Sequence, residues 1–303
     1  MVWATGRFSA SYNKSKQFEP NEYLTDYYTK NAVEVIEKNK NRPFFLYLGH
    51  WAIHNPLQSL KSDYDLHSDS GNHGLSVYSG MIEALDRSVG KIVKSLEDNG
   101  LTENTLIIFT SDNGGAGYIE LPDINQPYRG WKLTHFEGGM HVPFMAKWPS
   151  EISKGTRYDK PIHHTDIFHT IAAAVGAKVP DDRKLDGVDL MPFVKGVNKS
   201  VPHETLFWRE GHHQTVLHEG WKLIKSGRIN KRWLFNLKED PLEKINLVKE
   251  NESKVSELEV LLAKHNAEQA ETLWPSVMES PQLIDKHGGQ EYEEGDEYIY
   301  WPN

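Results

Sequence analysis

Acidic and amide side chains that could hold a metal ion follow a short apolar run in TLIIFTSDNGG, residues 105–115. The apolar residues 106–109 are β-branched or aromatic for the most part, which is typical of a strand buried on both faces of a parallel sheet. Asp112 and Asn113 then lie at the carboxyl end of this strand, where ligands bind in open α/β sheets. Their oxygen atoms suit Ca²⁺ or Mg²⁺, although these residues alone leave an ordinary turn without a metal open.

A histidine and two cations in other segments could form a pocket for an anion around such a metal. His54 lies in GHWAIHNPLQ, and Arg129 and Lys132 lie in PYRGWKLTHFEGG. His50 is a second histidine of the first segment. Converging on one sheet edge, these side chains would bind an anionic group beside a divalent cation. Taken singly, each also has a plainer interpretation as a loop histidine, a solvated lysine or an arginine paired with a carboxylate.

The spacing of apolar residues predicts the elements that would position these side chains. Apolar residues recur at helical spacing in three segments, 21–40, 78–96 and 165–175. Short apolar runs predict strands at 43–48, 106–109 and 142–148. The order of strand, helix and strand predicts a parallel crossover, with a long irregular insert at residues 49–78.

From about residue 205 the sequence changes to short strands separated by polar or glycine turns. The runs TLFWRE, QTVLHEG, WKLIKSG and RWLFNL predict an antiparallel sheet, and residues 252–270 predict a helix. The acidic and aromatic tail GGQEYEEGDEYIYWPN is expected along the surface. We therefore expect an α/β domain over residues 1–200 and a C-terminal domain of sheet, helix and extended tail over residues 201–303.

Composition counts against several classes of protein. The net charge of -9 argues against a nucleic-acid-binding protein. The apolar runs are too short to span a bilayer, so no membrane association is expected. The absence of cysteine removes disulfides, thiolate metal sites and cysteine nucleophiles. The first residues contain no apolar signal-peptide segment.

The order of these segments resembles the sulfatase family of the alkaline-phosphatase-like superfamily. The resemblance runs through RPFFLYLGHWAIHNPLQ, YSGMIEALDRSVGKIV, NTLIIFTSDNGG, YRGWKLTHFEGGMHVPFMAKWP and HHTDIFHTIAAAVGA to LDGVDLMPFVKG. It is closest in texture to arylsulfatases of the N-acetylgalactosamine-4-sulfatase type, and WKLI, LFNL and EDPLEKINL look like the small C-terminal domain of that family. The resemblance implies an α/β fold that is part of a three-layer α/β/α sandwich. It also implies hydrolysis of a sulfuric ester on a sulfated sugar or polysaccharide, in the periplasm or by a secreted protein.

Carried over residue by residue, the resemblance gives four side chains a role. Asp112 and Asn113 would be ligands of Ca²⁺. Lys132 would hold the sulfate oxygens, as a catalytic and substrate-binding residue. His54 would contact the sulfate and donate a proton to the leaving alcohol.

Two further side chains are expected only as substrate contacts. Arg129 and His50 match no family-wide catalytic position. The EGG segment that begins at Glu137 looks structural in the family. Two other functions stay open: a phosphate-ester hydrolase of the same superfamily, and a non-catalytic remnant that binds sulfated glycans.

The sequence departs from the family pattern at the nucleophile. The family makes a formylglycine from the first residue of a CxPSR or SxPSR motif, and the sequence contains neither. We therefore expect no sulfatase turnover from this chain alone. We also expect weak Ca²⁺ binding, because two ligands cannot satisfy a cation that takes about 6–8 oxygens. Besides a sulfated carbohydrate substrate, the N-terminal portion of the same enzyme is an expected partner.

Overall fold

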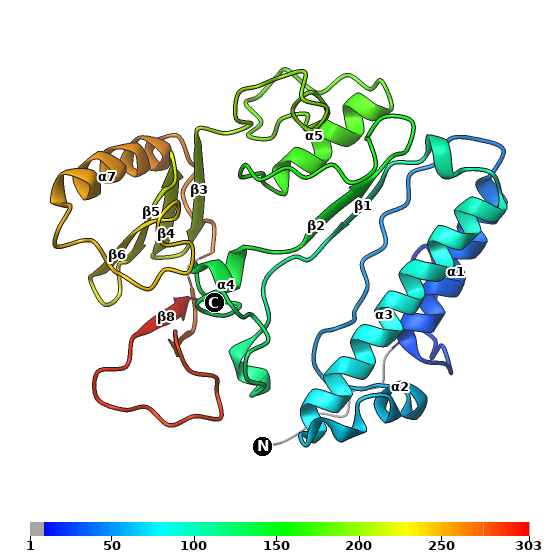
Figure 1. Ribbon diagram of the computed structural model, residues 1–303, viewed down its shortest axis with the longest axis horizontal. Coiled ribbons are helices and arrows are strands. Elements are labelled where there is room, and N and C mark those ends of the chain that lie inside the picture. The colour runs from blue at the N-terminus through cyan, green and yellow to red at the C-terminus, as the bar shows by residue number, and fades with distance from the viewer. Residues whose placement is uncertain (1–8, 275, 303) are drawn as a thin grey trace. The chain divides into compact units, whose positions relative to one another are not determined.

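The computed structural model describes residues 9–274 and 276–302 (Figure 1). The chain divides into two compact units, Met1–Thr105 and Leu106–Asn303, and each is described by itself. The expected domain boundary at residue 200 stays a prediction. No helix in the described part of the chain is long and apolar enough to cross a membrane.

The described part of the first unit is helical (Figure 1). Its elements are α1 (Leu24–Asn39), α2 (Lys61–Asp65) and α3 (His73–Asp98), with 3₁₀ turns at Ser68–Ser70 and Thr102–Asn104. The helices predicted at 21–40 and 78–96 are therefore confirmed as α1 and α3. The second of them starts earlier than expected, because Asn72 caps it by accepting a hydrogen bond from the backbone N–H of Leu75 at 3.1 Å.

Buried polar contacts join the three helices of this unit. The Thr29 hydroxyl of α1 donates to the Ser88 hydroxyl of α3 at 2.6 Å. Arg87 of α3 makes two hydrogen bonds, of 2.8 and 2.9 Å, with the buried Asp63 carboxylate of α2. A paired arginine fork of this kind fixes orientation as well as proximity. The helices therefore form a firm support for the loop at residues 49–60.

The strand expected at residues 43–48 does not form. These residues have no ladder partner among the described residues, and Phe45 and Tyr47 are 71% and 83% exposed. A strand needs a neighbour that accepts its backbone hydrogen bonds and a layer that covers its side chains. The prediction from apolar residues alone was wrong because neither is present here.

The first strands of the second unit pair antiparallel. The parallel crossover predicted from residues 43–48 to residues 106–109 was wrong because its first strand does not form. β1 (Ile107–Thr110) lies beside β2 (Phe144–Lys147), with Thr110 opposite Phe144. β1 is half-buried rather than buried on both faces, because the sheet has only two strands. The strands predicted at 106–109 and 142–148 are nevertheless confirmed. Between them the chain makes a long excursion that includes a 3₁₀ turn, Gly117–Ile119, and α4 (Glu137–Met140).

Further elements complete the second unit. They are α5 (Thr165–Ala174), α6 (Met191–Val194), β3 (Thr205–Glu210), β4 (His213–His218), β5 (Trp221–Ser226), β6 (Lys231–Asn236), α7 (Glu252–Ala267), β7 (Glu279–Leu283) and β8 (Tyr298–Pro302). β3 to β6 form an antiparallel sheet in sequence order, as predicted. The helices predicted at 165–175 and 252–270 are confirmed as α5 and α7.

Strand alternation gives the four-stranded sheet two apolar faces. On one face, Leu223 and Leu234 pack with Val255 and Leu258 of α7 (Figure 1). On the other, the buried cluster consists of Phe136, Ile224, Trp233, Phe235, Ile284 and Ile299. Successive strand residues point to opposite faces, so neighbouring apolar residues on β5 and β6 serve both layers. The sheet is thus the core of this unit.

The acidic tail does not simply lie along the surface. Its strand β8 pairs antiparallel with β7, and Ile299 is buried in the core cluster. The Trp301 indole donates to Glu210 at 2.9 Å. The expectation of a surface tail was therefore wrong for β8, because alternation in YIYWP turns one apolar residue inward.

Candidate functional site

The loop after β1 is built by short-range hydrogen bonds. The Asn113 backbone N–H donates to Asp112 Oδ1 at 3.0 Å, and the Asn113 side-chain amide donates to the Gly114 carbonyl at 2.9 Å. The Ser111 hydroxyl donates to the Asn113 carbonyl at 2.9 Å. The Asp112 side chain is exposed. A carboxylate and an amide oxygen therefore occupy adjacent positions of an ordered turn that follows the strand.

Backbone contacts bring the Lys132 segment against this loop. The Lys132 N–H donates to the Gly115 carbonyl at 2.9 Å, and the Gly114 N–H donates to the Gly139 carbonyl at 3.0 Å. A Cβ atom at Gly114 would lie 1.8 Å from the Gly138 carbonyl oxygen, so only glycine allows this approach. The structure thus holds the backbone of Lys132 against the loop that carries Asp112 and Asn113, within one unit.

Asn125 ties the same segments together from the side. Its side-chain oxygen accepts from the Gly115 N–H at 2.7 Å. Its side-chain nitrogen donates to the Gly115 carbonyl at 2.9 Å and to the Gly130 carbonyl at 3.1 Å. One amide therefore satisfies three backbone groups that the irregular loops would otherwise leave unpaired.

A buried ion triad holds the EGG segment that supports this arrangement. Lys222 of β5 is 1% exposed, and its ammonium group lies 2.7 Å from Glu137 Oε1 and 2.9 Å from Glu243 Oε1. Glu243 also accepts the Glu137 backbone N–H at 2.6 Å, and His141 lies 2.8 Å from the second oxygen of Glu137. α4 is therefore fixed to the four-stranded sheet by charge. The sequence-based expectation that this segment is structural agrees with these contacts.

The triad shifts the pKa values of its members in different directions. Burial alone would raise the pKa of Glu137, but the charge of Lys222 and the hydrogen bond with His141 lower it to about 2. Burial would lower the pKa of Lys222, but the charges of Glu137 and Glu243 raise it. The pKa of Glu243 is raised because this carboxylate is fully buried and Glu137 adds a like charge nearby. Of the two carboxylates, Glu137 is thus the one that stays ionised to lower pH.

Arg129 is paired with acidic side chains from residues 285–297 near the end of the chain. Its guanidinium lies 2.7 Å from both oxygens of Asp285 and 2.6 Å from Glu297, and it stacks over Phe136 at 4.9 Å. Burial alone would lower the pKa of Arg129, but the hydrogen bonds to Asp285 and Glu297 raise it above its usual value. The predicted substrate contact through Arg129 stays untested. Its observed partners give this residue a structural role.

His54 lies in the first unit, on the exposed loop after residues 43–48. Its Nδ1 is 2.7 Å from the Asn55 carbonyl, and its ring edge contacts Trp51 with centroids 5.2 Å apart. Because a carbonyl only accepts, Nδ1 carries the hydrogen in this bond. The proton that His54 could exchange with a substrate is therefore the one on Nε2. Convergence of His54 with Lys132, which belongs to the other unit, stays a prediction.

His50 contacts the helices of its own unit. Its Nε2 lies 3.0 Å from the Ser88 hydroxyl, and its ring packs near Tyr28. Burial lowers its pKa. The predicted substrate contact through His50 stays untested, and its observed environment is that of a residue in the packing between α1 and α3.

The donor set fits calcium as part of a coordination shell. Asp112 and Asn113 offer hard oxygen atoms, the type that Ca²⁺ prefers. Among residues 9–274 and 276–302 there is no group of three or more acidic or histidine side chains that could hold a metal ion. Two donors supply a minority of the ligands that calcium needs, so the remaining ligands would have to come from backbone oxygens, water or another segment.

Sequence reasoning missed Lys222, Glu243 and Asn125. Lys222 sits between inward apolar residues on a strand, and a lysine at such a position signals a buried carboxylate partner. Its two partners are distant in sequence, so nothing in the sequence named them. Asn125 lies in a segment without regular pattern and gave no signal.

A match to a family model is consistent with this arrangement and covers more than half of the chain. Residues 2–177 match the model described as Sulfatase. The chain belongs to the sulfatase family. Residues 130–271 also match the model described as N-sulphoglucosamine sulphohydrolase, C-terminal. The family expected from the sequence motifs is therefore confirmed.

Similar proteins extend this result to relatives and solved structures. Human (Homo sapiens) steryl-sulfatase is 38% identical over 191 residues, which cover 61% of this chain and 32% of the relative. N-acetylgalactosamine-6-sulfatase of Mus musculus is 37% identical over 195 residues, covering 62% of this chain and 36% of the relative. The crystal structure of Ps i-CgsB in complex with k-i-k-neocarrahexaose has a TM-score of 0.78 and 31% identity, covering 86% of this chain and 58% of that chain.

These likenesses confirm the fold class and define its extent. The chain has part of the alkaline-phosphatase-like α/β fold of sulfatases, with a C-terminal antiparallel sheet and helix. It spans about a third of the length of the two curated relatives, 32% and 36%, and 58% of the structure.

Proposed function

We propose that this chain provides the calcium-binding and sulfate-holding part of a sulfuric ester hydrolase, which acts on a sulfated sugar or polysaccharide. The observation that supports it best is the packing of Lys132 against the loop of Asp112 and Asn113, through the 2.9 Å bond from Lys132 N–H to the Gly115 carbonyl. A lysine whose backbone is held against a loop with two hard oxygen donors is suited to binding an anion that shares a divalent metal.

The chain's own residues perform two tasks in the proposed reaction. Lys132 holds the sulfate oxygens by charge. When the ester S–O bond breaks, its electron pair moves to the leaving oxygen, which takes a proton from Nε2 of His54. The ring is then neutral, with its remaining hydrogen on Nδ1, where the Asn55 carbonyl at 2.7 Å accepts it. The atom that attacks sulfur comes from a CxPSR or SxPSR segment, which this sequence does not contain.

Calcium is the proposed metal, with Asp112 and Asn113 as two of its ligands. When bound, it would supply fixed positive charge beside the sulfate. The exposed Asp112 carboxylate, and the ordered turn that places Asn113 next to it, support this assignment. Since two side chains fill only part of the shell, Ca²⁺ should bind to this chain alone only weakly.

The proposed substrate is a carbohydrate sulfate ester. This class is supported by a relative named N-acetylgalactosamine-6-sulfatase and by a structural relative solved with k-i-k-neocarrahexaose. A location in the periplasm or outside the cell, and a partnership with the polypeptide that carries the nucleophile, belong to the same proposal. Cell fractionation and co-purification would test these two points.

The proposal is tested by sequencing the DNA upstream of codon 1 and by assaying ester hydrolysis by the protein that the complete reading frame encodes. An in-frame CxPSR or SxPSR segment there is the expected result, and the complete product should hydrolyse a chromogenic aryl sulfate faster than the matching aryl phosphate. The purified chain of residues 1–303 should hydrolyse neither ester. Faster hydrolysis of the phosphate by the complete product would favour the phosphate-ester hydrolase instead. Robust aryl sulfate turnover by the purified chain would refute the proposed division of the site.

A further inference from the structure

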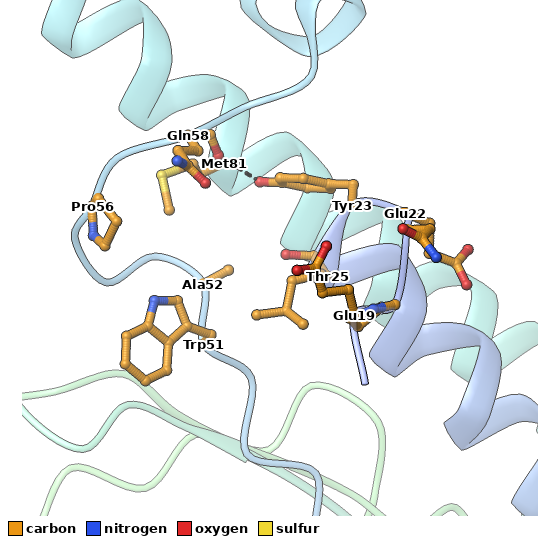
Figure 2. A pocket seen from close by; sticks show the side chains of 12 residues that line it. Glu19, Glu22, Tyr23, Thr25, Trp51, Ala52, Pro56, Gln58 and Met81 are labelled. Atoms are coloured by element: carbon orange, nitrogen blue, oxygen red, sulfur yellow. Dashed lines mark hydrogen bonds between the residues drawn. The ribbon is translucent and has the colours of Figure 1, made fainter. Parts of the chain in front are cut away.

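A pocket in the first unit opens beside the loop that carries His54 (Figure 2). It has a volume of about 350 Å³, and its walls include Trp51, Pro56 and Gln58 from the loop and Glu19, Glu22 and Tyr23 from the chain leading into α1. A volume of this size lies at the lower end of the range for small-molecule sites, roughly 300–1,000 Å³. The pocket is therefore large enough for one small ring.

Hydrogen bonds fix the two walls of this pocket relative to each other. The Tyr23 hydroxyl donates to the Gln58 carbonyl at 2.9 Å, which ties the loop to the start of α1 (Figure 2). On the loop side, the His54 N–H donates to the Trp51 carbonyl at 2.9 Å. His54 and Trp51 thus belong to one turn, and the histidine ring lies against the indole that forms part of the pocket wall, with centroids 5.2 Å apart.

The lining combines an aromatic face with hydrogen-bonding groups. Figure 2 shows the Trp51 ring on one side of the hollow and Glu19 and Thr25 across from it. Trp51 is 44% exposed, so part of the indole is accessible to a ligand. A pyranose ring presents C–H groups on its face and hydroxyls at its rim, and it needs an apolar face together with polar acceptors. An indole opposite carboxylate and amide groups offers both.

The charge of the lining selects against anions. Glu19 and Glu22 are its charged side chains, and no lysine or arginine is present among the lining residues that the structure describes. Lys30 pairs with Glu22 at 3.5 Å, but this surface pair is more than a third exposed on both sides. A sulfate or uronate group in the pocket would face like charge, whereas neutral hydroxyls can donate to the carboxylates.

We propose that this pocket is a subsite for an uncharged sugar residue adjacent to the sulfated residue in a carbohydrate chain. This inference rests on the proposed function, because it uses His54 as the position of the sulfated residue. It adds a preference that the sulfatase family does not specify: the neighbouring sugar carries neither sulfate nor carboxylate. Chains in which every second residue is a uronic acid are therefore poor ligands.

Binding of unsulfated oligosaccharides tests this inference without any turnover. Neoagarohexaose is the neutral probe, and a hyaluronan hexasaccharide, which carries carboxylates, is the acidic probe. Titration calorimetry and saturation-transfer NMR on the full chain should detect the neutral probe. They should detect the acidic probe at least about tenfold more weakly. Equal binding of both probes, or a preference for hyaluronan, would overturn the inference.

Matched variants identify the pocket as the binding place. Trp51→Ala should weaken binding of neoagarohexaose about tenfold, while Trp51→Phe should retain most of it because a ring face remains. Trp274→Ala is the control, since Trp274 is 80% exposed and lies outside the pocket. Unchanged binding by Trp51→Ala, with circular dichroism equal to that of the parent chain, would refute the assignment.

Charge variants test the selectivity. Glu22→Lys should improve binding of the hyaluronan hexasaccharide by about fivefold or more. Glu37→Lys, at an exposed position of α1 that does not line the pocket, should leave this binding unchanged. If both variants improved hyaluronan binding equally, the net charge of the protein alone would explain the change, and the selective subsite would be contradicted. These titrations need no calcium, nucleophile or sulfate, so a loss of neutral-sugar binding refutes the subsite and leaves the proposed function intact. A failed turnover assay refutes the proposed function, and with it the placement next to a sulfated residue, but not the measured binding of the neutral sugar.

Discussion

Replacing Lys222 by methionine should destabilise the second unit strongly. The lysine is 1% exposed and lies 2.7 Å from one oxygen of Glu137 and 2.9 Å from one of Glu243, which is 0% exposed. Methionine keeps most of the volume and flexibility of the side chain but removes its charge. Lys222→Met therefore leaves two carboxylates in a buried site without their cation.

Two estimates of the cost agree. Removing one partner of a buried ion pair typically costs about 3–5 kcal/mol. Lys222 and His141 together lower the pKa of Glu137 from 4.5 to about 2, and at 1.36 kcal/mol for each pKa unit this shift corresponds to about 3 kcal/mol, of which the charge of Lys222 contributes the largest share. With a urea m-value of about 1–3 kcal/mol/M, the unfolding midpoint should fall by roughly 2 M.

Urea unfolding followed by circular dichroism measures this change, with Lys225→Met as the control. Lys225 lies on the same strand and pairs with Glu259 at 2.7 Å at the surface, so its loss should cost less than about 1 kcal/mol. Adding Glu137→Gln and Glu243→Gln to Lys222→Met should recover a large part of the stability, because the unpaired charges are gone. An equal cost for Lys222→Met and Lys225→Met, or no recovery, would refute the role of the triad.

Three further changes test other parts of the account. Gly114→Ala would place a Cβ atom 1.8 Å from the Gly138 carbonyl oxygen, so the two segments must move apart, and the free energy of unfolding should fall by about 2 kcal/mol or more. Gly90→Ala is the control in the same thermal melt: its Cβ on a helix would have nothing within 4 Å, so the change should be neutral or stabilising. Asp112→Asn should abolish the weak Ca²⁺ binding that we expect for this chain in calorimetry, with a dissociation constant of roughly 10⁻³ M at best, without changing the melting temperature by more than a degree or two. An unchanged calcium isotherm would contradict the assignment. The lowered pKa of Glu137 contributes stability that is fully present above pH 4.5 and is lost as the pH falls toward about 2, so Glu137→Gln should flatten acid unfolding over that window, and an unaltered acid profile would count against it.

Local pattern was sufficient to predict most of the helices and the C-terminal sheet. The stripe of apolar residues on α3 buries one face of the helix, and β3 to β6 bury apolar residues on both faces of their sheet, in each case against neighbours within the same unit. The neighbours that cover these elements belong to the same unit, so the spacing of apolar residues along the sequence is enough to predict helix or strand. The same holds for the turn at Asp112 and Asn113, whose hydrogen bonds are local.

Elements whose partners lie far away could not be predicted in this way. The run at 43–48 looked like a buried strand, yet its apolar residues say nothing about whether a neighbouring strand is available. The direction of β2 beside β1 depends on the path of the 111–143 excursion, which has little regular pattern. The carboxylates that pair with Lys222 belong to Glu243 and to Glu137, which is 85 residues away in the chain. Those that pair with Arg129 lie 156 and 168 residues away. Residue type and spacing in the sequence could not identify such distant partners.

The rate of sulfate release by the complete, nucleophile-bearing enzyme tests the central claim most directly. Lys132→Ala should reduce the turnover rate of an aryl sulfate by about 10²–10³, as expected for the loss of one fixed electrostatic contact. Lys147→Ala, which removes an exposed cation at the far end of β2 from the loop, should leave the rate unchanged. Equal rates for the parent enzyme and Lys132→Ala, with calcium saturating, would contradict the proposal that this chain holds the sulfate.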